Sequence, residues 1–174
     1  MNNIQIPEPK LSRFLFSSTL FAWAWLPLRI WLGWQWLNAG WGKFTSPTWA
    51  GDKAGTVISG YFKGAIAKAT GEHPQVASWY ADFLQNVALP NATFFSYLVT
   101  FGEIAVGLGL ILGAFVGIAA FFGTFMNLNF ILAGTVSTNP VMFLVAIFLM
   151  LAWRNAGWVG LDRWLLPKIG VPWR

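Results

Sequence analysis

The chain has 174 residues, of which 56% are hydrophobic and 10% are charged, and its formal net charge is +5. Roughly a quarter of the residues in a soluble domain are charged, so this composition argues against a water-soluble protein. The sequence contains no cysteine and one histidine, His73, which excludes a structural disulfide, a cysteine-ligated iron–sulfur cluster and a bis-histidine haem. The basic residues are scattered, which favours loops facing anionic lipid headgroups over nucleic-acid binding.

Four apolar segments predict helices that cross a bilayer, which takes about 20 residues for each crossing. Only Gly113 and Ala114 separate the second segment from the third, which predicts a tight antiparallel hairpin. We therefore expect an all-α integral membrane protein that forms a single domain over residues 1–174, built as a four-transmembrane-helix bundle. The predicted spans are residues 20–42, 94–112, 115–134 and 141–153.

A long loop, residues 44–93, connects the first two predicted spans and is more polar than they are. Apolar residues repeat at one-face helical spacing over residues 57–66 and again over residues 76–87. This periodicity predicts two amphipathic helices that lie on the membrane surface or cap the bundle. The alternative is that these helices only tether the two spans. Residues 11–18 predict a short interfacial helix or an extension of the first span.

The distribution of charge predicts the orientation of the chain. An even number of spans places both termini on one side of the membrane, and the long loop on the other side balances its three lysines with three acidic residues. The positive-inside rule then favours cytoplasmic termini and an external loop. A cleaved signal peptide is not expected, because Glu8 lies near the start and the apolar run continues through bulky tryptophans. The basic residues flanking the spans on the terminal side are Lys10, Arg13, Arg154, Arg163, Lys168 and Arg174.

Two ionisable residues lie inside the predicted spans, Arg29 in the first and Glu103 in the second. An unpaired charge at that depth costs roughly 3 kcal/mol on insertion scales, so each side chain is expected to face the interior and find a partner. Helical rise counted from the span ends places both near the midplane, within about one turn of each other. The simplest prediction is that Arg29 and Glu103 pair with each other.

Further polar residues of the spans extend this candidate site. A protonatable carboxylate beside an arginine is suited to binding a quinone head group or passing its protons, and equally to binding an anion. For the asparagines the favoured alternative is structural, because small and polar residues join helices inside a membrane. The candidate catalytic residues are Glu103 and Arg29, and the candidate substrate- or quinone-binding residues are Trp36, Lys43, Asn38, Asn127 and Asn129. No metal-ligand cluster, P-loop or dinucleotide motif is present in the sequence.

Three stretches carry a resemblance to a known family. Residues 28–44, LRIWLGWQWLNAGWGKF, resemble the first-helix signature of the DoxX family, with its Leu-Arg pair and its small-Gly-x-x-Lys ending. Residues 101–140 resemble the remainder of that family, and their Gly-Glu pair, hairpin and Asn-rich third helix are similar to the DoxD branch. Residues 155–167, NAGWVGLDRWLLP, fit the tail of that branch, the small subunit of thiosulfate:quinone oxidoreductase.

The resemblance implies a four-helix bundle in a bacterial or archaeal cytoplasmic membrane. In the enzyme just named, this type of subunit works with a second subunit to oxidise thiosulfate to tetrathionate and pass electrons to quinone. Arg29, Lys43 and Glu103 match recurrent polar positions of the family. In the first hypothesis Glu103 handles protons, Arg29 holds Glu103 or a substrate anion, and Trp36 shapes a quinone pocket. Quinone is then a substrate, no cofactor is bound covalently, and membrane lipid and a second subunit or larger complex are the expected partners.

Two other functions remain open at this point, and with them the question whether the chain is an enzyme. The absence of a redox centre in the sequence, the many aromatic residues and the amphipathic loop suit a non-enzymatic scaffold subunit of a respiratory or photosynthetic membrane complex. A small anion transporter using Arg29 and Lys43 is the other alternative, although the sequence lacks the repeats common in transporters.

Overall fold

The computed structural model describes residues 7–171, and within that range all regular secondary structure is helical. This confirms the predicted all-α fold class. Arg174, one of the basic residues used to predict orientation, lies outside the described residues. The elements are α1 (Lys10–Ser17), α2 (Ala22–Phe44), α3 (Pro47–Ala50), α4 (Thr56–Ala67), α5 (Ser78–Phe83), the π-helical turn η1 (Leu84–Ala88), α6 (Ala92–Leu112), α7 (Val116–Leu132), α8 (Asn139–Leu151) and α9 (Asp162–Lys168).

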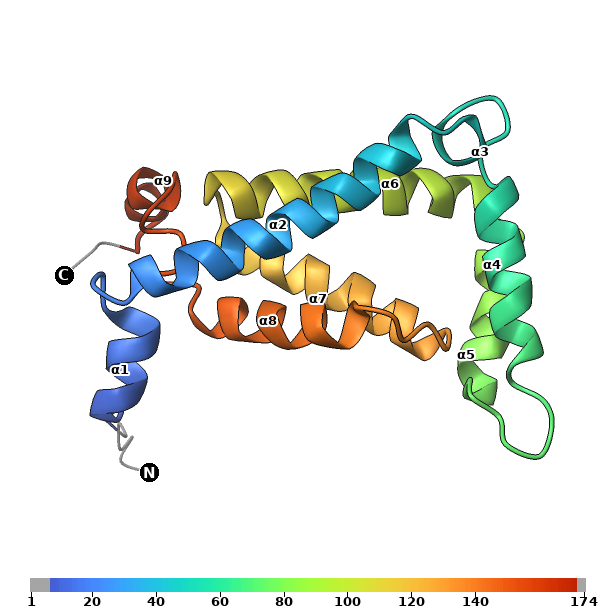
Figure 1. Ribbon diagram of the computed structural model, residues 1–174, viewed down its shortest axis with the longest axis horizontal. Helices are drawn as coiled ribbons and strands as arrows, with labels where there is room; N and C mark the ends of the chain where they lie inside the picture. Colours follow the sequence, from blue (N-terminus) through green and yellow to red (C-terminus); the bar gives the residue numbers. More distant parts are fainter. Residues whose placement is uncertain (1–6, 172–174) are drawn as a thin grey trace.

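Helices α2, α6, α7 and α8 form a four-helix bundle (Figure 1). Each of them packs against two others, in the pairs α2–α6, α6–α7, α7–α8 and α8–α2. These helices correspond to the four apolar segments of the sequence, with boundaries that differ by no more than two residues. Helices α4 and α5 stand across one end of the bundle, whereas α1 and α9 lie at the other end (Figure 1). We call these the loop end and the terminal end.

The bundle helices differ in length and apolar character. Helix α6, with 21 residues, is long and apolar enough to cross a membrane, and α1 and α2 meet the same requirement only together, with a 52° bend between them. Helices α7 and α8 are apolar but have 17 and 13 residues, fewer than the roughly 20 that a crossing takes. Within residues 7–171, length and composition thus identify one membrane-crossing helix, or two if the bent pair is one span.

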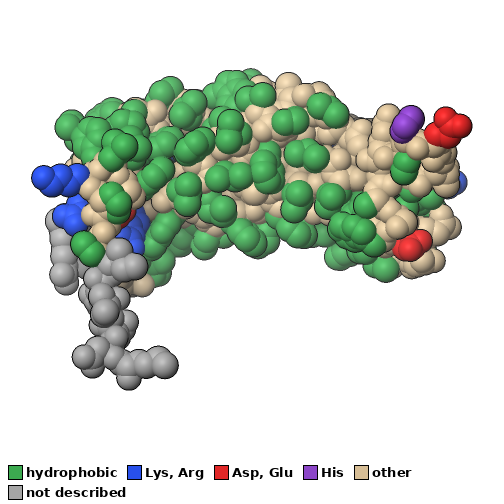
Figure 2. Space-filling model, turned by 90° about the horizontal axis from the view of Figure 1, so that it is seen from below, with side chains coloured by type: hydrophobic (Ala, Val, Ile, Leu, Met, Phe, Trp, Pro, Cys, Tyr) green, Lys and Arg blue, Asp and Glu red, His purple; other side chains and the backbone are tan. Residues whose placement is uncertain are grey.

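Apolar side chains cover the sides of the bundle, and charged side chains gather at its two ends (Figure 2). Large residues such as Trp34, Leu98, Phe121, Phe125 and Leu144 are all more than half exposed. Soluble monomers rarely expose contiguous apolar patches larger than a few hundred Å². Hydrocarbon chains of a lipid bilayer suit this surface, because every backbone polar group within a helix is already bonded.

The loop predicted at residues 44–93 caps the loop end of the bundle. Helix α4 and the α5–η1 segment share a second hydrophobic core that includes Ile58, Phe62 and Leu84. The Tyr80 hydroxyl donates to the backbone carbonyl of Asn129 at 3.0 Å, which attaches α5 to the end of α7. The structure therefore confirms the two amphipathic helices and supports the capping arrangement over a simple tether.

Helices α2 and α6 approach each other closely at glycines. A Cβ atom added to Gly107 would lie 2.5 Å from the backbone nitrogen of Leu37, and one added to Gly40 would lie 2.8 Å from the backbone nitrogen of Ile104. These distances are shorter than van der Waals contact, so neither position tolerates a side chain without moving the opposite backbone. The predicted role of small residues in helix packing is confirmed at this contact.

We expect Gly107→Ala to destabilise the protein, because the added methyl group must push α2 away from α6. The matched control is Gly42→Ala on α2, where an added Cβ meets nothing within 4 Å and where alanine gains about 1 kcal/mol of helix propensity over glycine. Thermal unfolding in detergent should show a lower midpoint for Gly107→Ala and an unchanged or higher one for Gly42→Ala. Equal midpoints for the two variants would contradict the close-contact interpretation.

Candidate functional site

The charged residue inside α6, Glu103, pairs with Lys43 near the end of α2. The Lys43 Nζ atom donates to Glu103 Oε2 at 2.7 Å, and the side chains are 20% and 2% exposed, respectively. The predicted pair of Arg29 with Glu103 is therefore wrong.

The error lies in the offset between the two helices. Helices α2 and α6 run antiparallel, with Leu37 opposite Gly107, so α2 begins beyond the end of α6 (Figure 1). Arg29 precedes Lys43 by 14 residues, which separates the two Cα atoms by about 21 Å along the helix. Arg29 consequently lies beside Gly113 at the terminal end of α6, whereas Glu103 lies toward the loop end.

Helix α3 covers the Lys43–Glu103 pair from the loop end. The Lys43 ammonium lies 5.1 Å from the ring centroid of Trp49, a distance at which the π-face attracts a cation. The Ser96 hydroxyl on α6 donates to the Trp49 carbonyl at 2.6 Å, which fixes α3 against the bundle. The Trp49 indole thus covers the ion pair on the side of the loop, while Glu103 remains the hydrogen-bond partner of Lys43.

Two further polar side chains in the bundle have no protein partner. The Trp36 Nε1 atom and both polar atoms of the Asn127 amide are buried and form no hydrogen bond. Gly123 makes room for the indole, since a Cβ there would lie 3.1 Å from Trp36 Nε1, and Asn127 follows Gly123 by one helical turn. Buried polar groups are almost always bonded, so these atoms have hydrogen-bonding capacity that a water molecule or a small polar group could use.

These four residues, Trp36, Lys43, Glu103 and Asn127, form what we call the loop-side cluster. Gly40 connects its members on α2 and α6, because an added Cβ there would meet Glu103 Cβ at 3.0 Å, and Trp36 and Lys43 lie about one turn on either side of it. The cluster combines a carboxylate, an ammonium group, an indole donor and an amide in the interior. Such a set can bind a group with two carbonyl or hydroxyl oxygens and can exchange a proton with it.

The remaining predicted residues lie elsewhere. Asn38 is exposed on the outer surface of α2. Asn129 contacts the cap, where its Oδ1 atom accepts from the Tyr80 hydroxyl at 3.1 Å and its Nδ2 atom donates to the Phe125 carbonyl at 2.8 Å. Of the seven predicted site residues, Lys43 and Glu103 contact each other. Trp36 lies one turn from Gly40, which packs against Glu103, and Asn127 lies one turn from Gly123, which packs against Trp36. Arg29, Asn38 and Asn129 lie elsewhere.

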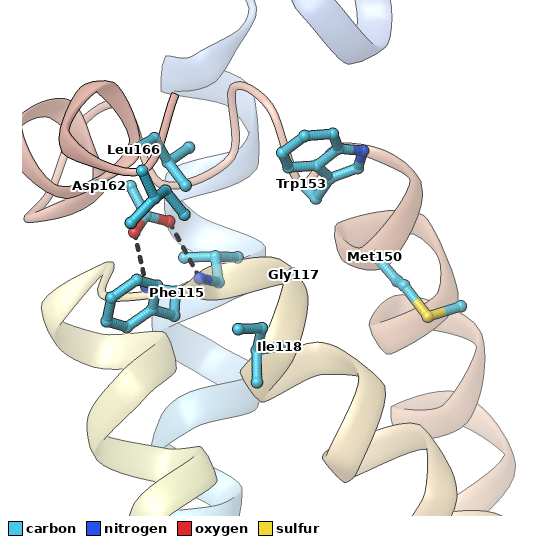
Figure 3. A pocket seen from close by; sticks show the side chains of 9 residues that line it. Phe115, Gly117, Ile118, Met150, Trp153, Asp162 and Leu166 are labelled. Carbon is cyan, nitrogen blue, oxygen red and sulfur yellow. Dashed lines mark hydrogen bonds between the residues drawn. The ribbon is translucent and has the colours of Figure 1, made fainter. Parts of the chain in front are cut away.

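Arg29 binds the C-terminal segment instead. Its Nη1 and Nη2 atoms donate to the carbonyls of Ala156 and Val159, each at 2.8 Å. The Asp162 carboxylate accepts from the backbone N–H groups of Phe115 and Val116 at 2.5 and 2.9 Å, at the start of α7 (Figure 3). These bonds fasten the C-terminal segment to the hairpin between α6 and α7.

Asp162 was not among the candidate residues selected from the sequence, which therefore missed this contact. Burial raises the pKa of its carboxyl, whereas the two N–H donors and the Arg29 guanidinium act in the opposite direction. A signal was present in the sequence: α7 follows Phe115, whose side chain cannot accept a hydrogen bond, so the free N–H groups of its first turn need an acceptor from another segment. Carboxylates are favoured at that position by the helix dipole.

We expect Lys43→Met to destabilise the protein by about 2–3 kcal/mol, because it leaves Glu103 buried without a cation. Replacing both partners, in Lys43→Met/Glu103→Leu, should recover at least half of that loss, since no charge then remains buried. Unfolding by SDS titration measures both variants, with the exposed Lys53→Met as the control. A double variant as unstable as Lys43→Met would contradict the pairing.

Comparison with known proteins identifies a family. The DoxX family model matches residues 24–136, well over half of the chain and including the whole loop-side cluster. No curated protein and no solved structure matches the chain significantly. The chain belongs to the DoxX family of membrane proteins.

Proposed function

We propose that this DoxX protein is a four-span membrane subunit whose loop-side cluster binds the head group of a quinone. The observation that carries the proposal is the set of unbonded polar atoms on Trp36 and Asn127 next to a buried carboxylate. A quinone offers two carbonyl acceptors, which suit the indole N–H and the amide N–H. The hydroquinone offers two hydroxyl donors, which suit the amide oxygen and Glu103.

Glu103 is the proposed proton donor of the site. Reduction of a quinone to a hydroquinone takes up two electrons and two protons, so a head-group site needs a residue that releases and regains protons. When Glu103 loses its proton, the ammonium group of Lys43 at 2.7 Å stabilises the carboxylate. Lys43 is the more exposed partner of the pair, so protons return to Glu103 from the loop end.

We propose thiosulfate as the electron source, on the strength of the resemblance to the DoxD branch. Two thiosulfate ions join through a new sulfur–sulfur bond to form tetrathionate and release two electrons, which together with two protons convert one quinone to hydroquinone. In this scheme a second subunit contributes to thiosulfate binding. Arg29 is assigned to holding the C-terminal segment, because its two terminal nitrogens already donate to backbone carbonyls.

The anion-transporter alternative has less support. Both cations expected to carry an anion are engaged by protein acceptors, Lys43 by Glu103 and Arg29 by carbonyls. The scaffold alternative is compatible with the exposed aromatic surface, and the experiment below separates it from the quinone proposal.

We expect Glu103→Gln to bind a quinone analogue and to lose thiosulfate-dependent quinone reduction, because the amide still accepts from Lys43 but carries no transferable proton. Trp36→Phe should weaken quinone binding about tenfold, the equivalent of one buried hydrogen bond. Its matched control is Trp34→Phe on the outer face of α2, which is 61% exposed. Binding is measured by calorimetry on the purified protein, and reduction in membranes that contain the natural partners.

Full reduction by Glu103→Gln would contradict the proton role. No quinone binding by the folded wild-type protein would contradict the head-group site and favour the scaffold function. Binding without thiosulfate-dependent reduction would retain the site and overturn thiosulfate as the electron source.

We further propose that all four bundle helices cross the membrane, with the termini in the cytoplasm. The short α8 is accommodated by local thinning of the bilayer or by flanking residues that reach the interface. On the face shown in Figure 2, Lys and Arg side chains gather at the terminal end, and acidic side chains lie at the loop end, where three acidic residues balance three lysines. A net positive charge at the terminal end alone is what the positive-inside rule describes for a cytoplasmic side.

A cysteine-accessibility experiment tests this orientation, and the absence of native cysteine makes it direct. We expect Lys63→Cys in α4 to react with a membrane-impermeant maleimide applied to intact cells, and Arg154→Cys after α8 to react only after the membrane is opened. The reverse pattern would place the termini outside. Labelling of both positions in intact cells would contradict the four-span topology.

A further inference from the structure

A cavity of about 240 Å³ lies at the terminal end of the bundle, where α7, α8 and α9 meet (Figure 3). It is separate from the loop-side cluster and plays no part in the function proposed above. Its lining is almost entirely apolar, with side chains from Phe115, Ile118, Met150, Trp153, Leu166 and Ile169. A volume of this size suits a segment of one hydrocarbon chain.

The single charged residue that lines the cavity is already satisfied. Both carboxylate oxygens of Asp162 accept backbone N–H groups, from Phe115 and Val116. Asp162 therefore needs no polar ligand, and the remaining surface favours an apolar one. Trp153 adds an amphipathic ring of the kind enriched at the membrane–water interface.

Two cationic residues are next to cavity-lining residues in the chain. Arg154 follows the lining residue Trp153, and its guanidinium carbon lies 5.5 Å from the centroid of that ring. Lys168 precedes the lining residue Ile169, and both cations are exposed. A ligand with an apolar chain and an anionic head fits this combination.

We propose that the cavity binds one acyl chain of an anionic phospholipid, whose phosphate group pairs with Arg154 and Lys168. The proposal rests on the membrane location of the family and not on quinone chemistry. A lipid in this position contacts Leu166 of α9, which begins at Asp162, and Ile169, which directly follows the helix. It therefore braces the contacts that hold the C-terminal segment against the hairpin.

The test uses the full chain, stripped of lipid in a neutral detergent. Phosphatidylglycerol and phosphatidylcholine with identical acyl chains are titrated against it, and bound lipids are counted by native mass spectrometry. We expect phosphatidylglycerol to bind more tightly, and R154Q/K168Q to lower its affinity about thirtyfold, since each cation near an anionic lipid contributes about a fivefold factor. The matched control, K53Q/K63Q, removes the same charge at the loop end and should leave the affinity unchanged.

A second variant tests the cavity without changing charge. I118W fills the space beside Phe115, and we expect it to weaken binding of both lipids while circular dichroism shows an intact helical content. Equal affinity of the wild-type protein for both lipids would overturn the proposal, and so would an equal loss in the control variant. Unchanged affinity of folded I118W would likewise overturn the assignment of the acyl chain to this cavity.

Discussion

The antiparallel contact between α2 and α6 is the constraint on which the rest of the structure depends. Because Gly107 lies against the backbone of Leu37, the two helices can meet in one register only. That register brings Lys43 to Glu103 and carries Arg29 to the opposite end of the bundle. A shift by one turn would replace the glycine with a residue too large for the contact and would separate the ion pair.

The two ends of the bundle bury charge in different ways. At the terminal end, Arg29 donates to carbonyls and Asp162 accepts from N–H groups, so backbone dipoles satisfy both charges and join two segments. At the loop end, Lys43 and Glu103 satisfy each other while nearby polar atoms on Trp36 and Asn127 lack partners. At the terminal end both terminal nitrogens of Arg29 and both oxygens of Asp162 are bonded, and only Arg29 Nε among these groups lacks a partner. At the loop end the indole N–H of Trp36 and the whole amide of Asn127 lack partners, so more hydrogen-bonding capacity is left for a ligand there.

Sequence periodicity predicted the helices and the amphipathic cap, because each depends on which face of a helix a residue occupies. It could not predict which charges meet, because the offset between two helices depends on packing between segments far apart in the chain. Counting helical rise from the ends of the apolar segments assumed that α2 and α6 begin and end at the same depth. The two helices are in fact offset along their axes. Trp36, Lys43, Glu103 and Asn127 were nevertheless selected as candidates, since each is a polar or amphipathic residue on an interior stripe.

The residues that match the family model include the Lys43–Glu103 pair but not all partners of Arg29. Residues 24–136 contain both partners of the Lys43–Glu103 pair, together with Trp36 and Asn127. The same range contains Arg29 and the N–H groups at the start of α7, but none of Ala156, Val159 and Asp162, with which they bond. The part of the chain that matches the family therefore forms the loop-side cluster by itself, whereas the contacts of Arg29 need the C-terminal segment. A function shared across the family is therefore better sought at Lys43 and Glu103. The contacts of Arg29 and Asp162 are better understood as holding this chain's own C-terminal segment in place.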